Sequence, residues 1–342
     1  MTDRTTSRWK GFNLLNLFIS KKEADMNGKY ERHLGDFSEE YIKWIADWGF
    51  NCIRIPMCYR NWVGDEKDFY KMDEVVLEKI DRVIEMGSRN GLHVSLNIHR
   101  APGYCINTEI QEPFDLWKDR EAQQLFCFYW ETFSKRYKGI SGDKLSFDLL
   151  NEPPCPEQGK MTEADYVRIM REAINTIREV DNNRKIVVEG LCGGNEPVFE
   201  LVDTGAIQSC RAYIPFGLSH YMAEWVSDQK WETPVWPGAK QDERPWDRKM
   251  LEDHYEKWVK LTRKGIPVIC GEGGAYIHTP HEVMLKWMED VLDILKSNNI
   301  GFLLWEFSGE FGIMDSKRRD VTYEDWHGHA LDRKMLELMR KY

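Results

Sequence analysis

The stretch LSFDLLNEPP, residues 145–154, joins an apolar strand to an abrupt polar end. Its first half carries leucine and phenylalanine at alternate positions, which is typical of a strand that contributes to a core. The run then stops on Asn151 and Glu152. Pro153 and Pro154 follow, and they prevent the strand from continuing because proline lacks a backbone N–H. A strand that ends in this way indicates that its end has a chemical role.

The same pattern of an apolar run followed by an amphipathic stretch recurs on both sides of this segment. Repeated units of this kind predict a parallel sheet with helices packed on it. Strands are expected at 11–16, 51–57, 93–99, 145–153, 185–190, 210–215, 266–274 and 300–307, and helices at 38–49, 72–91, near 119–138, 162–180, near 195–203, 248–264, 280–298 and near 330–341.

Eight such units in 342 residues predict a closed (β/α)8 barrel. A doubly wound sheet is the alternative, but it typically has fewer strands and a glycine-rich first turn, which is missing here. No linker or low-complexity segment interrupts the pattern. We therefore expect a single domain over residues 1–342, with a polar tail at 1–8 and a Trp-rich loop insertion at 221–248.

Composition and charge argue against several classes of function. The net charge of −10 opposes binding to nucleic acid, whose backbone is also negative. No window approaches 18 apolar residues, so no membrane partner is expected. The N-terminal sequence MTDRTTSRW lacks an apolar signal region, which favours the cytoplasm, and secretion is expected instead if a leader has been removed. We expect a monomer.

The cysteines and histidines do not indicate a metal or a disulfide framework. The eight cysteines include no C-x-x-C pair, and we interpret them as small buried apolar residues. His278 and His281 form an H-x-x-H motif without the further ligands that zinc requires. Motifs for phosphate loops, dinucleotide binding and nucleophile elbows are missing as well. No cofactor is expected.

Polar residues gather at the predicted carboxyl ends of the strands, where (β/α)8 barrels carry out their chemistry. A single glutamate at such a position is more often an ion-pair partner than a catalyst. Glu152 and Glu272, however, both lie in turns constrained by proline or glycine. Two carboxylates on one rim separate each other's pKa values, and a pair about 5–5.5 Å apart can hydrolyse a glycosidic bond with retention. The fourteen tryptophans would then supply flat surfaces for sugar rings.

Four motifs together resemble those of glycoside hydrolase family 5, the cellulase family of retaining glycosidases with a (β/α)8 fold. They are NCIRIP (51–56), NEP (151–153), GEGG (271–274) and LLWEF (303–307), and they fall in order on the expected strands. The resemblance extends from WKGFN (9–13) to LDRKMLELM (331–339).

The resemblance implies a role for each matching position. Glu152 corresponds to the acid/base and Glu272 to the nucleophile of the family. Asn151 would bind the sugar 2-hydroxyl, and Arg54 would lie near Glu272. A further two residues would contact the sugar that is cleaved, namely His99 beside the −1 subsite and Trp305 as its aromatic floor.

The sequence departs from the family on the sixth strand, within CRAYIPFGLSHYMAEW (210–225). The family usually has His-x-Tyr there. Tyr213 fits the tyrosine that contacts the nucleophile, but Arg211 replaces the histidine and cannot shuttle protons. The alternative alignment assigns the pair to His220 and Tyr221. We prefer the first, which leaves His220 at a second position familiar from the family.

Other rim candidates have a structural and a functional interpretation. At least one tryptophan of the 221–248 loop is expected to line a substrate cleft, the alternative being that they pack the loop onto the barrel. The candidates are Trp225, Trp231, Trp236 and Trp246. Glu306 and Glu310 are either substrate hydrogen-bond partners or structural acceptors. Asp148 is expected to be structural.

The expected function is a retaining β-glycoside hydrolase, with an endo-β-1,4-glucanase as the leading interpretation and an oligo- or polysaccharide as substrate. An exo-β-1,3-glucanase or a β-mannanase is the alternative, because HRAPG (99–103) also resembles the exo-β-1,3-glucanase branch. A non-catalytic carbohydrate-binding barrel is a rival from another class, suggested by Arg211. An aldolase- or isomerase-like barrel would need a strand-end lysine or a metal cluster, and neither is found.

Overall fold

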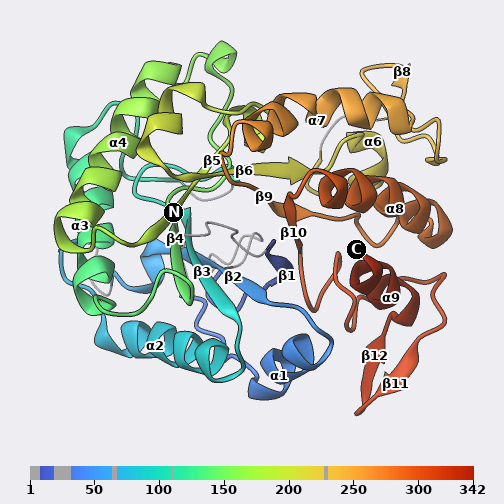
Figure 1. The fold of residues 1–342 in the computed structure, drawn as a ribbon, viewed down its shortest axis with the longest axis horizontal. Coiled ribbons are helices and arrows are strands. Elements are labelled where there is room, and N and C mark those ends of the chain that lie inside the picture. Colours follow the sequence, from blue (N-terminus) through green and yellow to red (C-terminus); the bar gives the residue numbers. More distant parts are fainter. Residues whose placement is uncertain (1–7, 19–31, 64–67, 109–110, 227–229) are drawn as a thin grey trace. The chain divides into compact units, whose positions relative to one another are not determined.

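The computed structural model describes residues 8–18, 32–63, 68–108, 111–226 and 230–342. Parallel strands form a closed barrel in the order β1-β10-β9-β6-β5-β4-β3-β2 (Figure 1). The strands are β1 (Lys10–Asn13), β2 (Cys52–Cys58), β3 (His93–Arg100), β4 (Leu145–Asp148), β5 (Lys185–Glu189), β6 (Ile207–Ala212), β9 (Val268–Gly273) and β10 (Gly301–Leu304). The prediction of a (β/α)8 barrel is confirmed.

The longer helices follow the predicted amphipathic stretches, but the helix expected near 195–203 is instead a 3-10 turn at Phe199–Thr204, and the short helices Leu191–Gly194 and Phe216–Ser219 were not expected. The helices are α1 (Glu39–Asp47), α2 (Glu74–Arg89), α3 (Arg120–Arg136), α4 (Glu163–Val180), α5 (Leu191–Gly194), α6 (Phe216–Ser219), α7 (Arg248–Arg263), α8 (His281–Ser297) and α9 (Arg333–Lys341), with 3-10 turns at Tyr59–Asn61, Pro156–Gln158 and Phe199–Thr204. Side-chain caps fix several of their starts. Thr162 and Asp165 form a reciprocal capping box at α4, and Asp73 accepts from Val75 at α2.

Most strands differ by a few residues from their predicted bounds, and the differences at β4 and β6 are the most informative. β4 ends at Asp148, yet the chain beyond it keeps bonding to its neighbours until Asn151, whose N–H donates to Ile98 at 3.3 Å. β6 begins at Ile207 rather than at residue 210. Gln208 is buried, and its side-chain amide accepts from the Val198 N–H and donates to the Val198 oxygen. This start was missed because the Gln208 side chain is polar.

The chain forms two compact units. Unit 1 comprises residues 1–13, 48–50 and 210–342, and unit 2 comprises residues 14–47 and 51–209. Within unit 2, α2, α3 and α4 follow one another along the outside of the strands (Figure 1). Within unit 1, α7, α8 and α9 pack in sequence.

Several tryptophans of unit 2 fill its core. Trp62 meets Tyr129 and Phe133 edge-on, and Trp130 lies 5.0 Å from the ring of Phe147 on β4. All of these side chains are buried. Part of the tryptophan excess therefore serves packing, as large aromatic side chains do in many cores.

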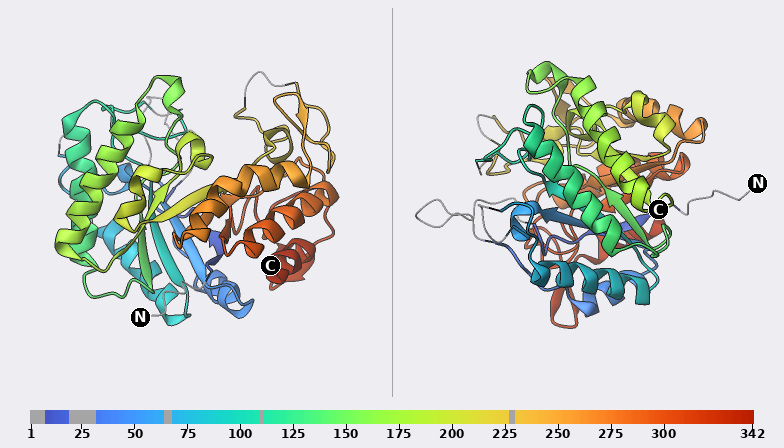
Figure 2. Two further views of the ribbon diagram at one scale, coloured as in Figure 1. Left: turned by 45° about the horizontal axis from the view of Figure 1, so that its top comes forward. Right: turned by 90° about the vertical axis from the view of Figure 1, so that its left-hand side faces the viewer.

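Unit 1 carries two small antiparallel ribbons. One joins β7 (Lys240–Gln241) to β8 (Arg244–Pro245), and Figure 2 shows it in gold, extending beyond α7. The other joins β11 (Glu324–Trp326) to β12 (His329–Leu331). Its tip residues, His327 and Gly328, have φ values of 55° and 86°, as a type I′ turn requires.

The cysteine interpretation was wrong for one pair. Cys155 and Cys192 form a disulfide across 37 residues of sequence. No spacing motif marks this pair, because the loops that follow β4 and β5 bring the two residues together. The remaining cysteines are free. Among the described residues, no helix is both long and apolar enough to cross a membrane.

Candidate active site

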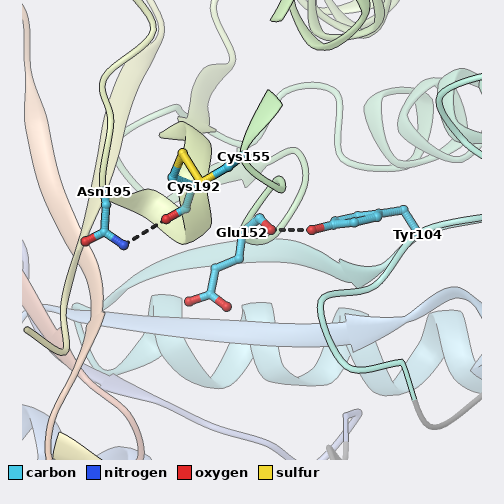
Figure 3. Close-up of a disulfide and its surroundings, with 5 residues drawn as sticks. All are labelled: Tyr104, Glu152, Cys155, Cys192 and Asn195. Atoms are coloured by element: carbon cyan, nitrogen blue, oxygen red, sulfur yellow. Dashed lines mark hydrogen bonds between the residues drawn. A yellow bond between two sulfur atoms is a disulfide. The ribbon is translucent and has the colours of Figure 1, made fainter. Parts of the chain in front are cut away.

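Glu152 lies just beyond β4 in a left-handed backbone conformation, with φ of 45°. This region costs a residue other than glycine about 1–2 kcal/mol, so the surrounding structure must hold it there. The hydroxyl of Tyr104 donates a hydrogen bond to the backbone oxygen of Glu152. Figure 3 shows the carboxylate leading away from Tyr104 and from the Cys155–Cys192 bridge.

Arg54 on β2 forms the centre of a buried charge cluster in unit 2. Its Nε bonds Asp148 Oδ2 at 2.6 Å, and its Nη2 bonds Glu189 Oε1 at 3.2 Å and Asn151 Oδ1 at 2.9 Å. These side chains are almost completely excluded from water. Asp148, which was expected to be structural, forms an ion pair with Arg54. Removing one member would leave a buried charge without compensation.

A series of hydrogen bonds sets the orientation of Asn151. Asn97 donates its amide to the backbone oxygen of Asp148, so its Oδ1 accepts from His99 Nδ1 at 3.1 Å. His99 Nε2 then carries no proton and accepts from Asn151 Nδ2, also at 3.1 Å. The structure therefore brings together three predicted site residues, Arg54, His99 and Asn151, and Asn151 directly precedes Glu152 in the chain.

Glu272 lies on β9 in unit 1 and is held through its side chain. Arg211 Nη2 bonds its Oε1 at 3.2 Å, and the Tyr213 hydroxyl bonds its Oε2 at 3.3 Å. Glu272 is 3% exposed and Arg211 is 1% exposed. The predicted contact between Tyr213 and this carboxylate is present, and Arg211 makes the ion pair from the position of the family's histidine.

His220 packs behind Tyr213 instead of taking its place. Its ring stacks on Phe216 at 4.0 Å and meets the ring of Tyr213 edge-on at 5.1 Å. Desolvation by these surroundings lowers the pKa of His220 to about 3, so the ring is neutral near pH 7. The chain therefore places Arg211 and Tyr213, not His220 and Tyr221, against Glu272.

Trp305 follows β10 and belongs to an aromatic cluster of unit 1. Its backbone N–H donates to the oxygen of Gly273 at 2.9 Å, and its peptide bond to Glu306 is cis. The half-buried indole packs on a core that includes Tyr276 and Phe311. The backbone of Trp305 is thus bonded to the residue that directly follows Glu272 on the neighbouring strand.

The tryptophans of the Trp-rich loop differ in burial, and two of them pack the loop onto unit 1. Trp236 is buried and donates its Nε1–H to Asp290 on α8 at 2.8 Å, and Trp246 packs on His254 of α7. These side chains attach the loop to unit 1. Trp225 is 47% exposed while its ring packs on Tyr276 at 4.9 Å. Trp225 therefore keeps part of its aromatic surface exposed, and Trp231, which meets the ring of Tyr221 edge-on at 6.0 Å, is partly exposed as well.

The two acidic candidates near the end of β10 have structural contacts. The Glu306 carboxylate folds over Gly309, where an added Cβ would come within 2.3 Å of Oε1. Glu310 hydrogen-bonds the hydroxyl of Tyr276, and burial together with this carboxylate raises the pKa of Tyr276 to about 12. Each of these two carboxylates therefore has at least one structural contact within the protein.

A metal-like cluster and a cavity are formed by residues other than the two glutamates. Among the described residues, Cys155, Glu157 and Cys192 form a three-ligand group, but the disulfide removes the thiolates that a metal would need. A cavity of about 330 Å³ lies against the β7–β8 ribbon, lined by residues 216–217, 230–235 and 238–243. Trp231, one of the tryptophans expected to line a substrate cleft, lies in its wall, whereas Glu152 and Glu272 do not line it.

Comparison with known proteins identifies the family. A model described as Cellulase (glycosyl hydrolase family 5) matches residues 19–311. The chain belongs to glycosyl hydrolase family 5. It is therefore a glycoside hydrolase with a cellulase-type (β/α)8 barrel, and the family resemblance seen in its motifs is confirmed.

Relatives of this family 5 hydrolase include Endoglucanase C of Acetivibrio thermocellus, 28% identical over 323 residues that cover 86% of this chain and 91% of the relative. Cellodextrinase A of Ruminococcus flavefaciens is 27% identical over 277 residues, covering 77% and 76%. A crystal structure of a glycoside hydrolase superposes with a TM-score of 0.91 at 36% identity, covering 98% of this chain and 99% of that one. Cel5A of Thermotoga maritima with mannotriose shares the fold at 23% identity and a TM-score of 0.73, covering 97% of both chains.

Three features of the site were missed by reasoning from the sequence. Glu189 ends β5 as Glu152 follows β4, so the same strand-end argument could have found it. The Tyr104 bond and the Cys155–Cys192 bridge left no local signal, because each joins segments that only the loop conformations bring together.

Proposed function

We propose that this family 5 hydrolase cleaves β-1,4-glucan internally and with retention, using Glu152 as acid/base and Glu272 as nucleophile. Its family membership and relatives named endoglucanase and cellodextrinase support this substrate class. The contacts of Glu272 carry the proposal furthest. Both of its carboxylate oxygens accept hydrogen bonds, which suits a group that attacks better than one that donates a proton.

The proposed reaction proceeds by double displacement. Glu152 protonates the leaving oxygen while Glu272 attacks the anomeric carbon and forms a glycosyl-enzyme. Glu152, now a carboxylate, then takes a proton from water, which releases the sugar and restores both groups. The chemistry needs no metal or organic cofactor.

The residues around the two glutamates would bind and orient the sugar. Asn151, fixed by Arg54 and His99, would bond the 2-hydroxyl, where contacts that strengthen in the transition state contribute to catalysis. Trp305 would stack against the sugar ring. Arg211 would act by holding Glu272 and would not transfer protons.

We propose that residues 1–342 function as one catalytic domain and as a monomer. Of the two expected locations, the disulfide favours an oxidising one outside the cytoplasm.

Turnover of an activated aryl β-cellobioside by the wild type, Glu152→Gln and Glu272→Gln tests the assignment. We expect both variants to lose activity, and azide to rescue Glu152→Gln with retained configuration in the product, since azide needs no base. NMR of the first-formed product reads the configuration. An inverted product, or rescue of neither variant, would contradict the assignment.

The substrate is tested separately on carboxymethyl-cellulose, β-mannan and β-1,3-glucan. The proposal expects the highest kcat/KM and a rapid fall in viscosity with the first. A preference for either of the others would replace the β-1,4-glucan assignment while leaving the glutamates in place. Binding of oligosaccharides without turnover would instead favour a carbohydrate-binding barrel.

A further inference from the structure

The backbone around Glu152 is held from two sides within unit 2. On one side, the buried Tyr104 donates its hydroxyl proton to the Glu152 oxygen. On the other side, the N–H of Gly193 donates to the oxygen of Pro153 at 2.9 Å, and Cys155 is joined covalently to Cys192. Figure 3 shows the bridge and Tyr104 on either side of Glu152. The left-handed conformation of Glu152 thus lies between a hydrogen bond and a covalent link.

The turn that receives these contacts is itself well fixed. Cys192, Gly193 and Gly194 all have positive φ, at 57°, 63° and 79°. Asn195 bonds the Cys192 oxygen through its side chain at 2.8 Å, and Leu191 bonds Glu196 through its backbone at 2.8 Å. A turn bonded to itself in this way, directly after β5, is a firm anchor for a neighbouring loop.

The two cysteines are placed where a covalent link has an effect on Glu152. Cys155 lies only three residues after Glu152, and both intervening residues are prolines. Each proline fixes its own φ, so the backbone between Glu152 and Cys155 has few free torsions. A movement of Cys155 therefore displaces Glu152. The Gly193–Pro153 bond alone would leave Cys155 and the residues after it free to move.

We propose that the Cys155–Cys192 disulfide is a positioning device for the acid/base, so that opening it weakens proton transfer to the leaving group. This inference rests on the proposed role of Glu152. It makes the hydrolase dependent on the redox state of its surroundings, although neither sulfur touches the substrate.

Opening the bridge requires a dithiol reductant. One thiolate of the reductant attacks a sulfur of the bridge, and its second thiol completes the exchange. The reductant loses two electrons and two protons and becomes a cyclic disulfide, while Cys155 and Cys192 become thiols. Reoxidation reverses the reaction, so the same sample can be measured in both states.

Leaving-group dependence separates a positioning role from a general loss of structure. Protonation assists a poor leaving group such as phenol, whereas 2,4-dinitrophenolate departs without it. We therefore measure kcat/KM for phenyl and 2,4-dinitrophenyl β-cellobioside on the same sample, before and after reduction. The ratio of the two values does not depend on how much of the protein is folded.

Reduction is expected to lower kcat/KM for the phenyl substrate on the order of tenfold, less than the hundredfold that a full misplacement can cost, and to change the dinitrophenyl value by less than about twofold. Cys155→Ser/Cys192→Ser should behave as the reduced wild type and no longer respond to the reductant. Cys127→Ser, at a free cysteine of α3, should respond as the wild type does.

An equal loss on both substrates, or no change on reduction, would overturn the inference. Glu152→Gln on the same two substrates tests the underlying assignment. If it shows the leaving-group ratio of the wild type, Glu152 is not the acid and the proposed function fails as well. If Glu152→Gln loses far more kcat/KM on the phenyl than on the dinitrophenyl substrate while reduction of the wild type has no effect, only the role of the bridge is refuted.

Discussion

The two glutamates assigned to catalysis are held in opposite ways. Glu272 lies on the regular strand β9 and is fixed by its side chain, with Arg211 and Tyr213 each bonding one oxygen. Glu152 lies beyond the end of β4 and is fixed by its backbone, through Tyr104 and the loop that ends in the disulfide. Its carboxylate leads away from these contacts (Figure 3).

This difference fits the tasks proposed for the two groups. A nucleophile attacks one carbon from one direction, so fixing its oxygens lowers the cost of reaching the transition state. An acid/base must first give a proton to an oxygen and later take one from water. The contacts to the backbone around Glu152 fix the point from which its carboxyl group would serve both steps.

Breaking the ion pair of Glu272 should have the largest effect on stability. Arg211→Met leaves a buried carboxylate without its cation, and we expect the free energy of unfolding to fall by about 3–5 kcal/mol. Urea denaturation measures this change. Adding Glu272→Gln to Arg211→Met should recover much of the loss, because the uncompensated charge is then gone.

An exposed arginine of the same unit provides the control for that experiment. Arg263 pairs with Glu256 on the surface of α7, and both side chains are largely solvent-accessible. Arg263→Met should cost less than about 1 kcal/mol. A loss of that small size for Arg211→Met would show that Glu272 does not depend on the ion pair.

Acid should weaken the strands that support the loop of Glu152. His93 on β3 is buried, bonds Asp143 and Ser146, and desolvation lowers its pKa to about 3. Below a pH of about 6.5 the unfolded chain binds a proton there that the folded chain excludes, so stability falls from that pH toward 3.

The size of this effect can be measured by urea denaturation at pH 7.5 and pH 5. The contribution of His93 should be a loss of about 2 kcal/mol between the two. His93→Gln should reduce the pH dependence by that amount. Identical pH profiles for the wild type and His93→Gln would refute the prediction.

Tyr213→Phe tests the side-chain support of Glu272 without changing charge. It removes one hydrogen bond of 3.3 Å, worth about 1 kcal/mol, or about a fivefold loss in kcat/KM. Because the nucleophile attacks every substrate, the loss should be similar for phenyl and dinitrophenyl β-cellobioside. A loss confined to the phenyl substrate would assign Tyr213 to proton transfer instead.

Tyr104→Phe is the matched substitution at Glu152 and should give the smallest effect. It removes the hydroxyl that bonds the Glu152 backbone oxygen, and the bridge and the Gly193 bond remain. We expect a loss in kcat/KM of about threefold for the phenyl substrate and almost none for the dinitrophenyl substrate. Equal losses on both would remove the contrast between the two glutamates.

The barrel could be predicted from the sequence because its strands are buried on both faces and appear as nearly continuous apolar runs. Polar residues within or just after such runs stand out, which is why Arg54, Glu152 and Glu272 could be selected. The start of β6 was misjudged since its buried Gln208 is satisfied by a partner distant in sequence.

Contacts between loops could not be predicted in the same way. Cys155 meets Cys192 only because Glu152 and the residues 192–194 adopt left-handed conformations, which no local pattern demanded of Glu152 or Cys192. Such conformations are stabilised by tertiary contacts and are unfavourable in isolation. The positions of the candidate site residues are therefore easier to predict from the sequence than the loop contacts that fix their conformation.

The β11–β12 hairpin provides an attachment point for practical use of the hydrolase. Its tip residues His327 and Gly328 turn the chain in the way that Asn-Gly pairs favour, and Gly328 N–H is bonded by Asp325 at 3.1 Å. Exposed tips of this kind accept insertions well. A single cysteine at residue 327, which is exposed, would allow the protein to be immobilised or joined to a sugar-binding module through a defined position.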